Sequence, residues 1–411
     1  MQHKNSAPLT SKQYLVPFVL ITSLFFLWGF ARAILDVLNK HFQNELNISL
    51  TESSMIQVIT YLGYFIMALP AGLFINRFGY RRGVVTGLLL YAAGAFLFIP
   101  SSAYNALGGY LVALFVIACG LTFLETSANP YATELGPKET ATSRLNLAQS
   151  FNGMGSALAP AIVGAFLFTS ADADVSMPYI VMGIVVLVVA LIFYNSRLPE
   201  IKSEEVADVK DPEAENADGI QNLKLLMHNK LFLFGLAALL AYEVAEISIN
   251  SYFINFTTGM NWIEADKASY ILSFSLFIFM GGRFVGSWIM RKVAAERMLL
   301  WCGIGSVVCI AALLCGTSLG VLPVWLSIAL IMANYFCEAI MFPTIFSLTL
   351  RGLGNLTKSA SSVLMMTPVG GCGFLLMAWL SDVSGSLIIP FIIPLIGYTI
   401  VALFARKLVK G

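Results

Sequence analysis

The sequence predicts an all-α membrane protein of about twelve transmembrane helices. Hydrophobic residues make up 58% of the 411 residues and charged residues only 11%, whereas ordinary soluble domains carry about 25% charged residues. The mean hydropathy is correspondingly high, at +0.80. Long apolar runs recur along the chain, and landmarks of its first half return in its second half.

A helix that crosses a bilayer needs about 20 mostly apolar residues. The first expected helix follows a polar leader, residues 1–13. Its apolar run exceeds the roughly 7–15 residues of a secretory signal core, so we expect it to span the membrane. The expected helices cover residues 14–38, 54–76, 83–100, 107–131, 144–169, 177–196, 231–257, 267–290, 298–317, 321–349, 360–381 and 387–407.

One long polar and acidic stretch, residues 197–230, separates the sixth and seventh expected helices. We therefore expect an N-terminal six-helix bundle over 1–196, a cytoplasmic linker over 197–230 and a C-terminal six-helix bundle over 231–411. This linker is too short for a nucleotide-binding module, which excludes an ATP-driven pump. No basic patch with interleaved aromatic residues supports a nucleic-acid partner.

The positive-inside rule predicts that both termini and the linker are cytoplasmic. With the N-terminus inside, the lysines and arginines fall on the cytoplasmic side, with four exceptions. Two of the exceptions are expected outside and two within helices: Lys40, Lys267, Arg32 and Arg283.

Two residue pairs of the first half recur in the second half at nearly the same sequence offset, which indicates a duplicated six-helix unit. Many secondary transporters use such repeats, with the substrate site near the bilayer midplane where the repeats meet. The repeated pairs are Gly72–Arg77 with Gly286–Arg291, and Glu125–Pro130 with Glu338–Pro343.

Charged residues lie deep in several apolar runs, on the first and fourth helices of each half. A charge at the centre of a membrane helix costs roughly 2.5–3.5 kcal/mol, so such residues face a water-filled cavity or one another. They are candidates for substrate binding and ion coupling: Arg32, Asp36, Glu125, Glu243, Glu246 and Glu338.

Asp36 and Glu125 are the candidate proton-coupling residues. Asp36 lies four residues after Arg32, on the same helical face, so one alternative is a structural salt bridge that keeps Asp36 ionised. Arg32 could instead pair with Glu125 or Glu338. Glu125 has no basic neighbour within a turn or two on its own helix. Burial without a partner favours the protonated form of a carboxyl group. No histidine lies in an expected helix, so a proton relay must use carboxylates.

Amide and aromatic side chains within the helices are candidates for contact with a sugar. Carboxamides both donate and accept hydrogen bonds, and aromatic rings offer flat faces. Interhelical packing is the alternative explanation for each of them. The candidate substrate-binding residues are Trp28, Arg32, Gln149, Asn152, Tyr242, Glu243, Glu246, Asn250 and Glu338.

The segment from Gly72 to Arg82 resembles the loop signature of the major facilitator superfamily, and the segment Gly282–Lys292 resembles its second-half copy. The resemblance implies the major facilitator fold and a gating role for this loop. Asn76 occupies a position where an aspartate is usual. This departure argues against gating by an ion pair at that position. The implied gating residues are Gly72, Asn76, Arg77, Arg81, Arg283 and Arg291.

Further motifs resemble the fucose–galactose–glucose:proton symporter family over nearly the whole chain. They are Leu24–Trp28 continued to Asp36, Gly63–Gly72, Leu124–Pro130, Arg144–Asn152, Tyr242–Glu246 and Phe342–Leu348. By this resemblance Asp36 and Glu125 match acids tied to proton coupling, and Gln149 and Asn152 match sugar-contact positions. Arg32, Glu243 and Glu338 depart from the family pattern, which points to a different substrate or altered coupling.

We therefore expect a secondary active transporter that imports a monosaccharide (a hexose, fucose or an amino sugar) with protons by alternating access. Sodium-coupled or uniport sugar transport, or an efflux antiporter of the same fold, are the alternatives. The segment Gly155–Pro160 is faintly similar to an antiporter signature, and close helix packing explains it equally well.

No catalytic cluster or metal-binding spacing is present in the sequence, so we expect neither an enzyme nor a resident metal or cofactor. The expected coupling ion is a proton. The expected partners are the sugar and the lipid bilayer, and the expected oligomeric state is a monomer. The apolar runs predict a multi-pass membrane protein, and the family resemblance implies that the membrane is the bacterial inner membrane.

Overall fold

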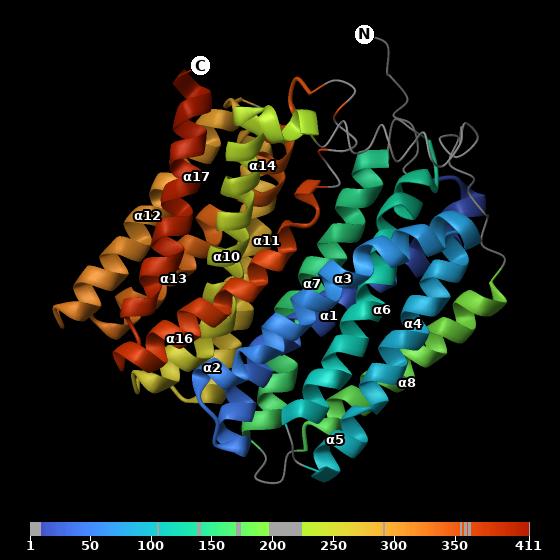
Figure 1. Ribbon diagram of the computed structural model, residues 1–411, viewed down its shortest axis with the longest axis horizontal. Helices are drawn as coiled ribbons and strands as arrows, with labels where there is room; N and C mark the ends of the chain where they lie inside the picture. The colour runs from blue at the N-terminus through green and yellow to red at the C-terminus, as the bar shows by residue number, and fades with distance from the viewer. Residues whose placement is uncertain are drawn as a thin grey trace. The chain divides into compact units, whose positions relative to one another are not determined.

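The computed structural model describes residues 10–104, 107–137, 141–169, 174–196, 224–290, 292–353, 356, 360 and 363–410. The described chain is helical (Figure 1). Among these residues, eleven helices are long and apolar enough to cross a membrane. The chain divides into two compact units, residues 1–41 with 62–207, and residues 42–61 with 208–411.

The first unit holds the helices expected before the linker. Each begins and ends within several residues of its predicted bounds, except that the first continues beyond residue 38. They are α1 (Leu15–Leu46), α3 (Met55–Phe78), α4 (Tyr80–Phe96) continued by α5 (Phe98–Tyr104), α6 (Leu107–Glu134), α7 (Ala141–Thr169) and α8 (Ser176–Asn195). α1 and α3 also contribute residues to the second unit.

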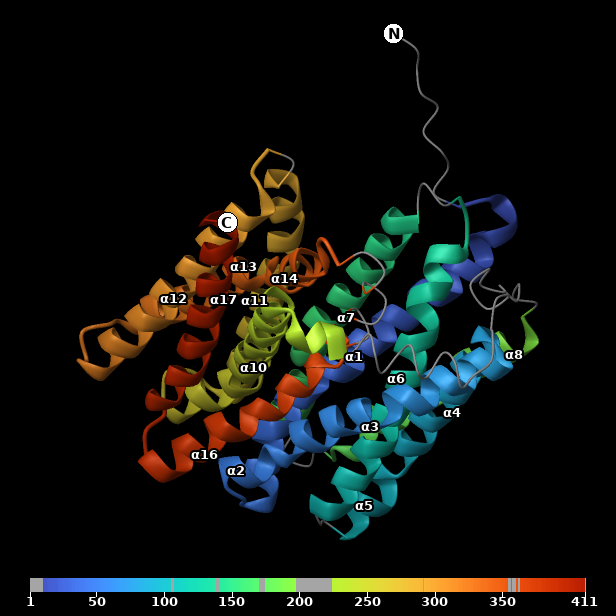
Figure 2. The same cartoon turned by 45° about the horizontal axis from the view of Figure 1, so that its top comes forward.

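Small residues allow α4 to pack closely on α6 (Figure 2), and α8 also packs on α4. A Cβ atom added at Gly120 of α6 would lie 2.6 Å from the carbonyl oxygen of Gly87 on α4. This distance is shorter than van der Waals contact, so the two backbones touch only because both positions lack a side chain. Close approach through small residues is the usual way in which membrane helices gain packing energy.

The loop before α8 is held by Asp174. Its carboxylate accepts hydrogen bonds from the Ser176 backbone N–H (2.8 Å), the Ser176 hydroxyl (2.6 Å) and the Ser102 hydroxyl of α5 (2.9 Å). Partial burial by itself raises the pKa of Asp174. The hydrogen bonds from Ser176 and Ser102, with nearby His41, outweigh burial and hold the pKa below its ordinary value.

The second unit is built around α10, against which α17 and a 3-10 segment pack; α10 and α17 run side by side in Figure 1. A Cβ atom at Gly397 of α17 would lie 2.7 Å from the Ala241 carbonyl oxygen of α10. The elements are α2 (Leu50–Ser53), α10 (Lys230–Gly259), α11 (Ala265–Ile289), α12 (Ala295–Ser318), α13 (Val324–Glu338), α14 (Met341–Leu350), the 3-10 helix η5 (Thr367–Gly373), α16 (Phe374–Ser384), the 3-10 helix η6 (Ile389–Phe391) and α17 (Ile392–Lys410).

The single helix expected over 321–349 is instead two helices, because α13 ends at Glu338 and α14 begins at Met341. Pro343 explains the interruption. Proline has no backbone N–H and cannot bond to the carbonyl four residues earlier, which here belongs to Ala339. Ala339 and Ile340 accordingly form a turn between the two helices.

The helix expected over 360–381 also differs from the prediction. Within the described residues this region is the 3-10 helix η5 followed by the short helix α16. Pro368 and three glycines disfavour an α-helix in η5. They also let its backbone approach its neighbours: a Cβ atom at Gly370 would lie 2.8 Å from Cβ of Glu243, and one at Gly371 would lie 2.3 Å from the Tyr61 ring.

Residues 42–61, which we call the strap, belong to the second unit although they precede the linker in the chain. The Thr51 backbone N–H and hydroxyl donate to Asp382 Oδ2 at 2.8 and 2.5 Å, and Gln57 Nε2 donates to Ser251 Oγ at 3.1 Å. The predicted bundle boundaries, 1–196 and 231–411, stay a prediction. Most of the predicted linker, residues 197–223, lies outside the described residues.

Candidate functional site

In the first unit, α1 carries three of the predicted site residues on neighbouring turns. Trp28 is 7% exposed, and its indole N–H donates to the Tyr64 hydroxyl of α3 at 2.9 Å. Arg32 and Asp36 follow at intervals of one turn, and both are half-buried. The sequence analysis did not single out Tyr64, although this tyrosine lies within the Gly63–Gly72 motif.

Two predicted sugar-contact residues on α7 already make hydrogen bonds inside this unit. Asn152 Nδ2 donates to the Phe25 carbonyl oxygen of α1 at 3.2 Å, and Gln149 Nε2 donates to Asn129 Oδ1 of α6 at 3.3 Å. Both side chains are half-buried. The interhelical role that the sequence analysis gave as the alternative is therefore present, and each amide keeps further hydrogen-bonding capacity.

α1 and α7 are in backbone contact where these amides lie. A Cβ atom at Gly29 would lie 2.1 Å from the Asn152 carbonyl oxygen, and one at Gly155 would lie 2.2 Å from the Phe26 carbonyl oxygen. Ser156 Oγ also donates to the Gly29 carbonyl oxygen at 3.1 Å. Gly155 thus has a packing role, as the sequence analysis allowed.

Glu125 lies on α6, half-buried, within electrostatic range of the Arg32 guanidinium. Glu125 was one of the three acids that the sequence analysis offered as partners for Arg32. Arg32 and Asp36 each have interaction partners in the structure as well. A cation and two acids are therefore gathered in the first unit, on α1 and α6.

In the second unit, one stretch of α10 supplies four predicted site residues. Tyr242 and Glu243 are buried, at 1% and 4% exposure, and Glu246 is half-buried. Asn250 Nδ2 donates to Glu246 Oε1 at 3.2 Å, as an i, i+4 pair on one helical face. The pair presents carboxylate oxygens and an amide together, which can accept from and donate to a polar ligand.

Glu338 ends α13 and is fully buried. Its Oε2 accepts a hydrogen bond from Asn334 Nδ2 at 2.9 Å and a short one from the Tyr398 hydroxyl of α17. Asn334 Nδ2 also donates to the Tyr398 oxygen at 3.1 Å. The sequence analysis missed Asn334 and Tyr398; the i, i+4 spacing of Asn334 and Glu338 was an available signal for the first, and no local signal exists for the second.

Arg283, a predicted gating residue on α11, binds at the break between α13 and α14. Its Nε donates to the Ala339 carbonyl oxygen at 3.2 Å, and its guanidinium lies 4.6 Å from the centre of the Phe279 ring. Ala339 has this carbonyl free because Pro343 lacks the N–H that would bond to it within a helix. The proline therefore creates the acceptor that the arginine uses.

The other predicted gating residues do not form one cluster in the described part of the chain. Gly72 has open space around its Cβ position, whereas its repeat counterpart Gly286 would place a Cβ 2.2 Å from Ile340. Arg77 is exposed and lies 5.2 Å from the centre of the Phe78 ring. Arg81 donates to the Tyr194 carbonyl oxygen.

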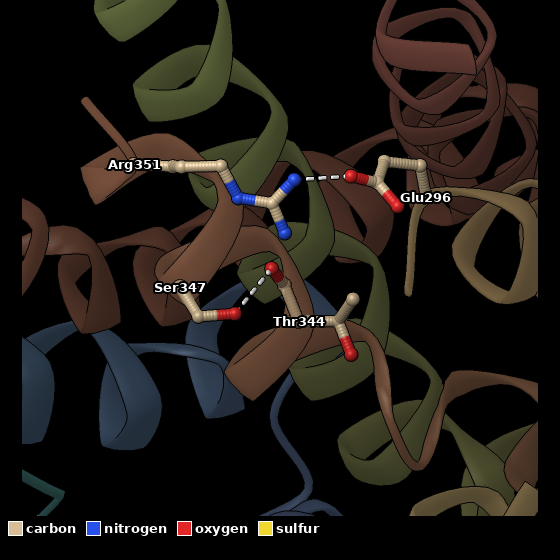
Figure 3. Close-up of polar contacts among 4 residues, drawn as sticks. All are labelled: Glu296, Thr344, Ser347 and Arg351. Atoms are coloured by element: carbon tan, nitrogen blue, oxygen red, sulfur yellow. Dashed lines mark hydrogen bonds and ion pairs between the residues drawn. The ribbon is translucent and has the colours of Figure 1, made fainter. Parts of the chain in front are cut away.

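Two predicted gating positions cannot be placed. Arg291 lies outside the described residues, and for Asn76 the structure describes the helical backbone of α3 and not the side chain. A charged contact that the sequence analysis did not single out joins α14 to α12 (Figure 3). There Arg351, directly after α14, forms an ion pair with Glu296 in the first turn of α12.

No group of three or more metal-binding side chains occurs among the described residues. The candidate site consists of charged and polar side chains on membrane helices, with interrupted helices beside them. Such discontinuous helices at charged positions are common at the substrate and ion sites of secondary transporters.

The chain matches the sequence profile of the Major Facilitator Superfamily over residues 21–374. The chain belongs to the major facilitator superfamily. The glucose/galactose transporter of Brucella abortus biovar 1 (strain 9-941) is 35% identical over 408 residues, which cover 96% of this chain and 94% of that protein. The L-fucose-proton symporter of Escherichia coli (strain K12) is 31% identical over 423 residues, with the same two coverages.

Solved structures agree with this assignment. A crystal structure of the Escherichia coli fucose:proton symporter, FucP, is 30% identical and matches with a TM-score of 0.67 over 96% of this chain and 99% of that one. These similarities confirm the predicted resemblance to the fucose–galactose–glucose:proton symporters. They also confirm a multi-pass membrane transporter of the major facilitator fold and exclude an enzyme.

Proposed function

We propose that this protein imports a monosaccharide together with protons across a bacterial inner membrane by alternating access. The observation that carries the proposal is full-length similarity to a glucose/galactose transporter and to an L-fucose-proton symporter. In this proposal the chain is a monomer in the lipid bilayer, with two six-helix bundles and both termini in the cytoplasm. The coupling ion is a proton, and no other cofactor takes part.

Asp36 and Glu125 are the proposed proton-coupling residues. A carboxyl group held inside a membrane protein binds a proton more readily than one in water, because burial penalises the charged form. Arg32 lies within electrostatic range of Glu125, so this cation belongs to the proposed coupling site. By linkage, a proton that favours sugar binding must itself be bound more tightly when sugar is present.

The proposed sugar-binding residues are the amide, aromatic and charged side chains Trp28, Arg32, Gln149, Asn152, Tyr242, Glu243, Glu246, Asn250 and Glu338. Sugar hydroxyls donate and accept hydrogen bonds, and amide–carboxylate pairs such as Asn250–Glu246 answer both needs. The charges of Arg32, Glu243 and Glu338 favour a hexose other than fucose or an amino sugar.

The proposal is tested by measuring external pH in lightly buffered, de-energised cells that express the protein, while single sugars are added. We expect alkalinisation with one sugar, because each sugar that enters carries a proton with it. Glu125→Gln should abolish the alkalinisation, since an amide cannot bind and release the proton. Glu296→Gln is the matched control, because it removes a carboxylate that pairs with Arg351, directly after α14.

Entry of labelled sugar without any pH change would overturn proton coupling and favour sodium coupling or a uniporter. Expulsion of preloaded sugar by an inward proton gradient would favour an antiporter of the same fold. Alkalinisation that persists in Glu125→Gln would leave Asp36 as the coupling residue and contradict the role of Glu125.

A further inference from the structure

The two carboxyl oxygens of Glu338 differ in their hydrogen bonds. Its Oε2 receives hydrogen bonds from both Asn334 and Tyr398, whereas its buried Oε1 has no hydrogen-bond partner among the described residues. An ionised carboxylate carries acceptor capacity on both oxygens. A buried anionic oxygen with no donor is therefore far more costly than a buried hydroxyl.

No lysine or arginine of the described chain forms an ion pair with Glu338. The acid with which it interacts most closely is Glu246 of α10, which disfavours a second negative charge. The carboxyl is also completely buried at the end of α13. Burial, a like charge and a missing cation all favour the neutral acid, with the proton on Oε1 and Oε2 acting as the carbonyl oxygen.

A movement of Arg283 would change the protonation state of Glu338. It binds the carbonyl oxygen of Ala339, the residue directly after Glu338, and both Arg283 and Glu338 lie within electrostatic range of Tyr242. The carbonyl is a neutral acceptor, and a guanidinium gains more from a carboxylate than from a carbonyl. A movement of the arginine from the Ala339 carbonyl to the Glu338 carboxylate would therefore stabilise the ionised acid.

The remaining groups around Glu338 add no positive charge. Besides Glu246 and Tyr242, α17 contributes the neutral hydroxyl of Tyr398, and α14 has no titratable side chain within its bounds. The thiols of α12 interact with Cys337, the residue before Glu338, and not with Glu338 itself. Glu243 lies on α10, within electrostatic range of Tyr242, and is a further acid.

We propose that Glu338 is a proton-binding site in the second half of the chain. It holds a proton on Oε1 while Arg283 is bound to the Ala339 carbonyl, and it loses that proton when Arg283 turns to the carboxylate. In the release step the O–H bond of Oε1 breaks and the proton passes to water. Arg283 exchanges its hydrogen bond to the Ala339 carbonyl for an ion pair with the carboxylate.

This site is distinct from Asp36 and Glu125, and only its use in transport depends on the proposed proton-coupled function. The test therefore needs no sugar. Infrared spectra of the purified, full-length protein at neutral pH are expected to contain the C=O stretch of a protonated, buried carboxylic acid. One such band should be lost in Glu338→Gln and remain in Glu296→Gln.

A band unchanged by Glu338→Gln would overturn the proposal. Tyr398→Phe provides a second measurement in case the glutamine variant fails to fold. Loss of the tyrosine hydroxyl removes a hydrogen bond to the C=O oxygen, so the band should move to higher frequency without vanishing. A spectrum identical to that of the unsubstituted protein would contradict the assignment of the band to Glu338.

The role of Arg283 is tested by following the same band against pH. Arg283→Gln should raise the pH at which half of the Glu338 band is lost by about one to three units, because the cation that stabilises the ionised form is gone. Arg283→Lys keeps the charge and should leave the midpoint closer to that of the unsubstituted protein. An unchanged midpoint in Arg283→Gln would overturn the part assigned to Arg283.

Discussion

Polar residues within the helices of this transporter serve two needs at once. Asn152 donates to a backbone carbonyl of α1, and Asn250 donates to Glu246 on its own helix. Each bond satisfies a group that would otherwise be costly to bury, and each leaves a further donor or acceptor for a ligand. A family motif identified Asn152, and its polarity within an apolar run identified Asn250. Neither signal specifies the hydrogen-bond partner, which lies on another helix or another turn.

Asp174, outside the apolar helices, gives a residue-scale prediction about pH. Its pKa is held below the ordinary value by the Ser176 and Ser102 hydrogen bonds, so its stabilising effect is present above the unfolded pKa of about 3.9. The effect is lost as pH falls through the lower pKa of the folded state. Asp174→Asn should therefore cost about 1 kcal/mol or less at pH 7.

The measurement is the thermal unfolding midpoint in detergent at several pH values. The difference in unfolding midpoint between Asp174→Asn and the unsubstituted protein should become smaller below about pH 4. Glu45→Gln, at an exposed position near the end of α1, is the control. A difference in unfolding midpoint that is constant with pH would mean that the carboxylate charge contributes nothing to stability.

At the scale of the elements, two interruptions separate this structure from a set of uniform helices. Pro343 breaks the expected tenth helix beside Glu338, and η5, with its glycines, interrupts the expected eleventh helix over Thr367–Gly373. Hydropathy detects neither interruption, because proline and glycine are tolerated in membrane helices when neighbouring groups satisfy the freed backbone. Here Arg283 supplies one such group.

The contact between α1 and α7 leads to an element-scale prediction. Gly29→Ala would place a methyl group 2.1 Å from the Asn152 carbonyl oxygen, so the two helices must separate. Overpacking of this kind costs about 1–3 kcal/mol. We expect a lower unfolding midpoint in detergent and reduced transport.

Gly108→Ala is the matched control, because this glycine of α6 has open space at its Cβ position. Alanine there should be neutral or slightly stabilising, since glycine lowers helix stability. Equal unfolding midpoints for the two variants would mean that α1 and α7 are not in contact at Gly29.

At the scale of the whole molecule, the order of the chain and the compact units do not coincide. The strap precedes the linker by more than a hundred residues and yet packs within the second unit, through the Thr51–Asp382 and Gln57–Ser251 hydrogen bonds. α1 and α3 thereby take part in both units. Alternating access, as proposed, requires the strap to separate from the second unit during each cycle.

Cross-linking tests this requirement. In a background without the six native cysteines, Thr51→Cys and Asp382→Cys should react together with a short bifunctional thiol reagent and stop sugar uptake. Either single substitution treated with the same reagent is the control and should retain uptake. Uptake that continues at full rate in the cross-linked double variant would show that the strap and α16 need not part.

The sequence by itself determined the membrane class, the helical fold, the family and the charged residues of the candidate site, because hydropathy, charge placement and motifs are local properties of the chain. Only the tertiary structure decided which groups meet. Examples are Tyr398 with Glu338, Arg283 with the Ala339 carbonyl, and the strap with α16. Such pairings depend on how distant helices pack, and no pattern of neighbouring residues encodes that packing.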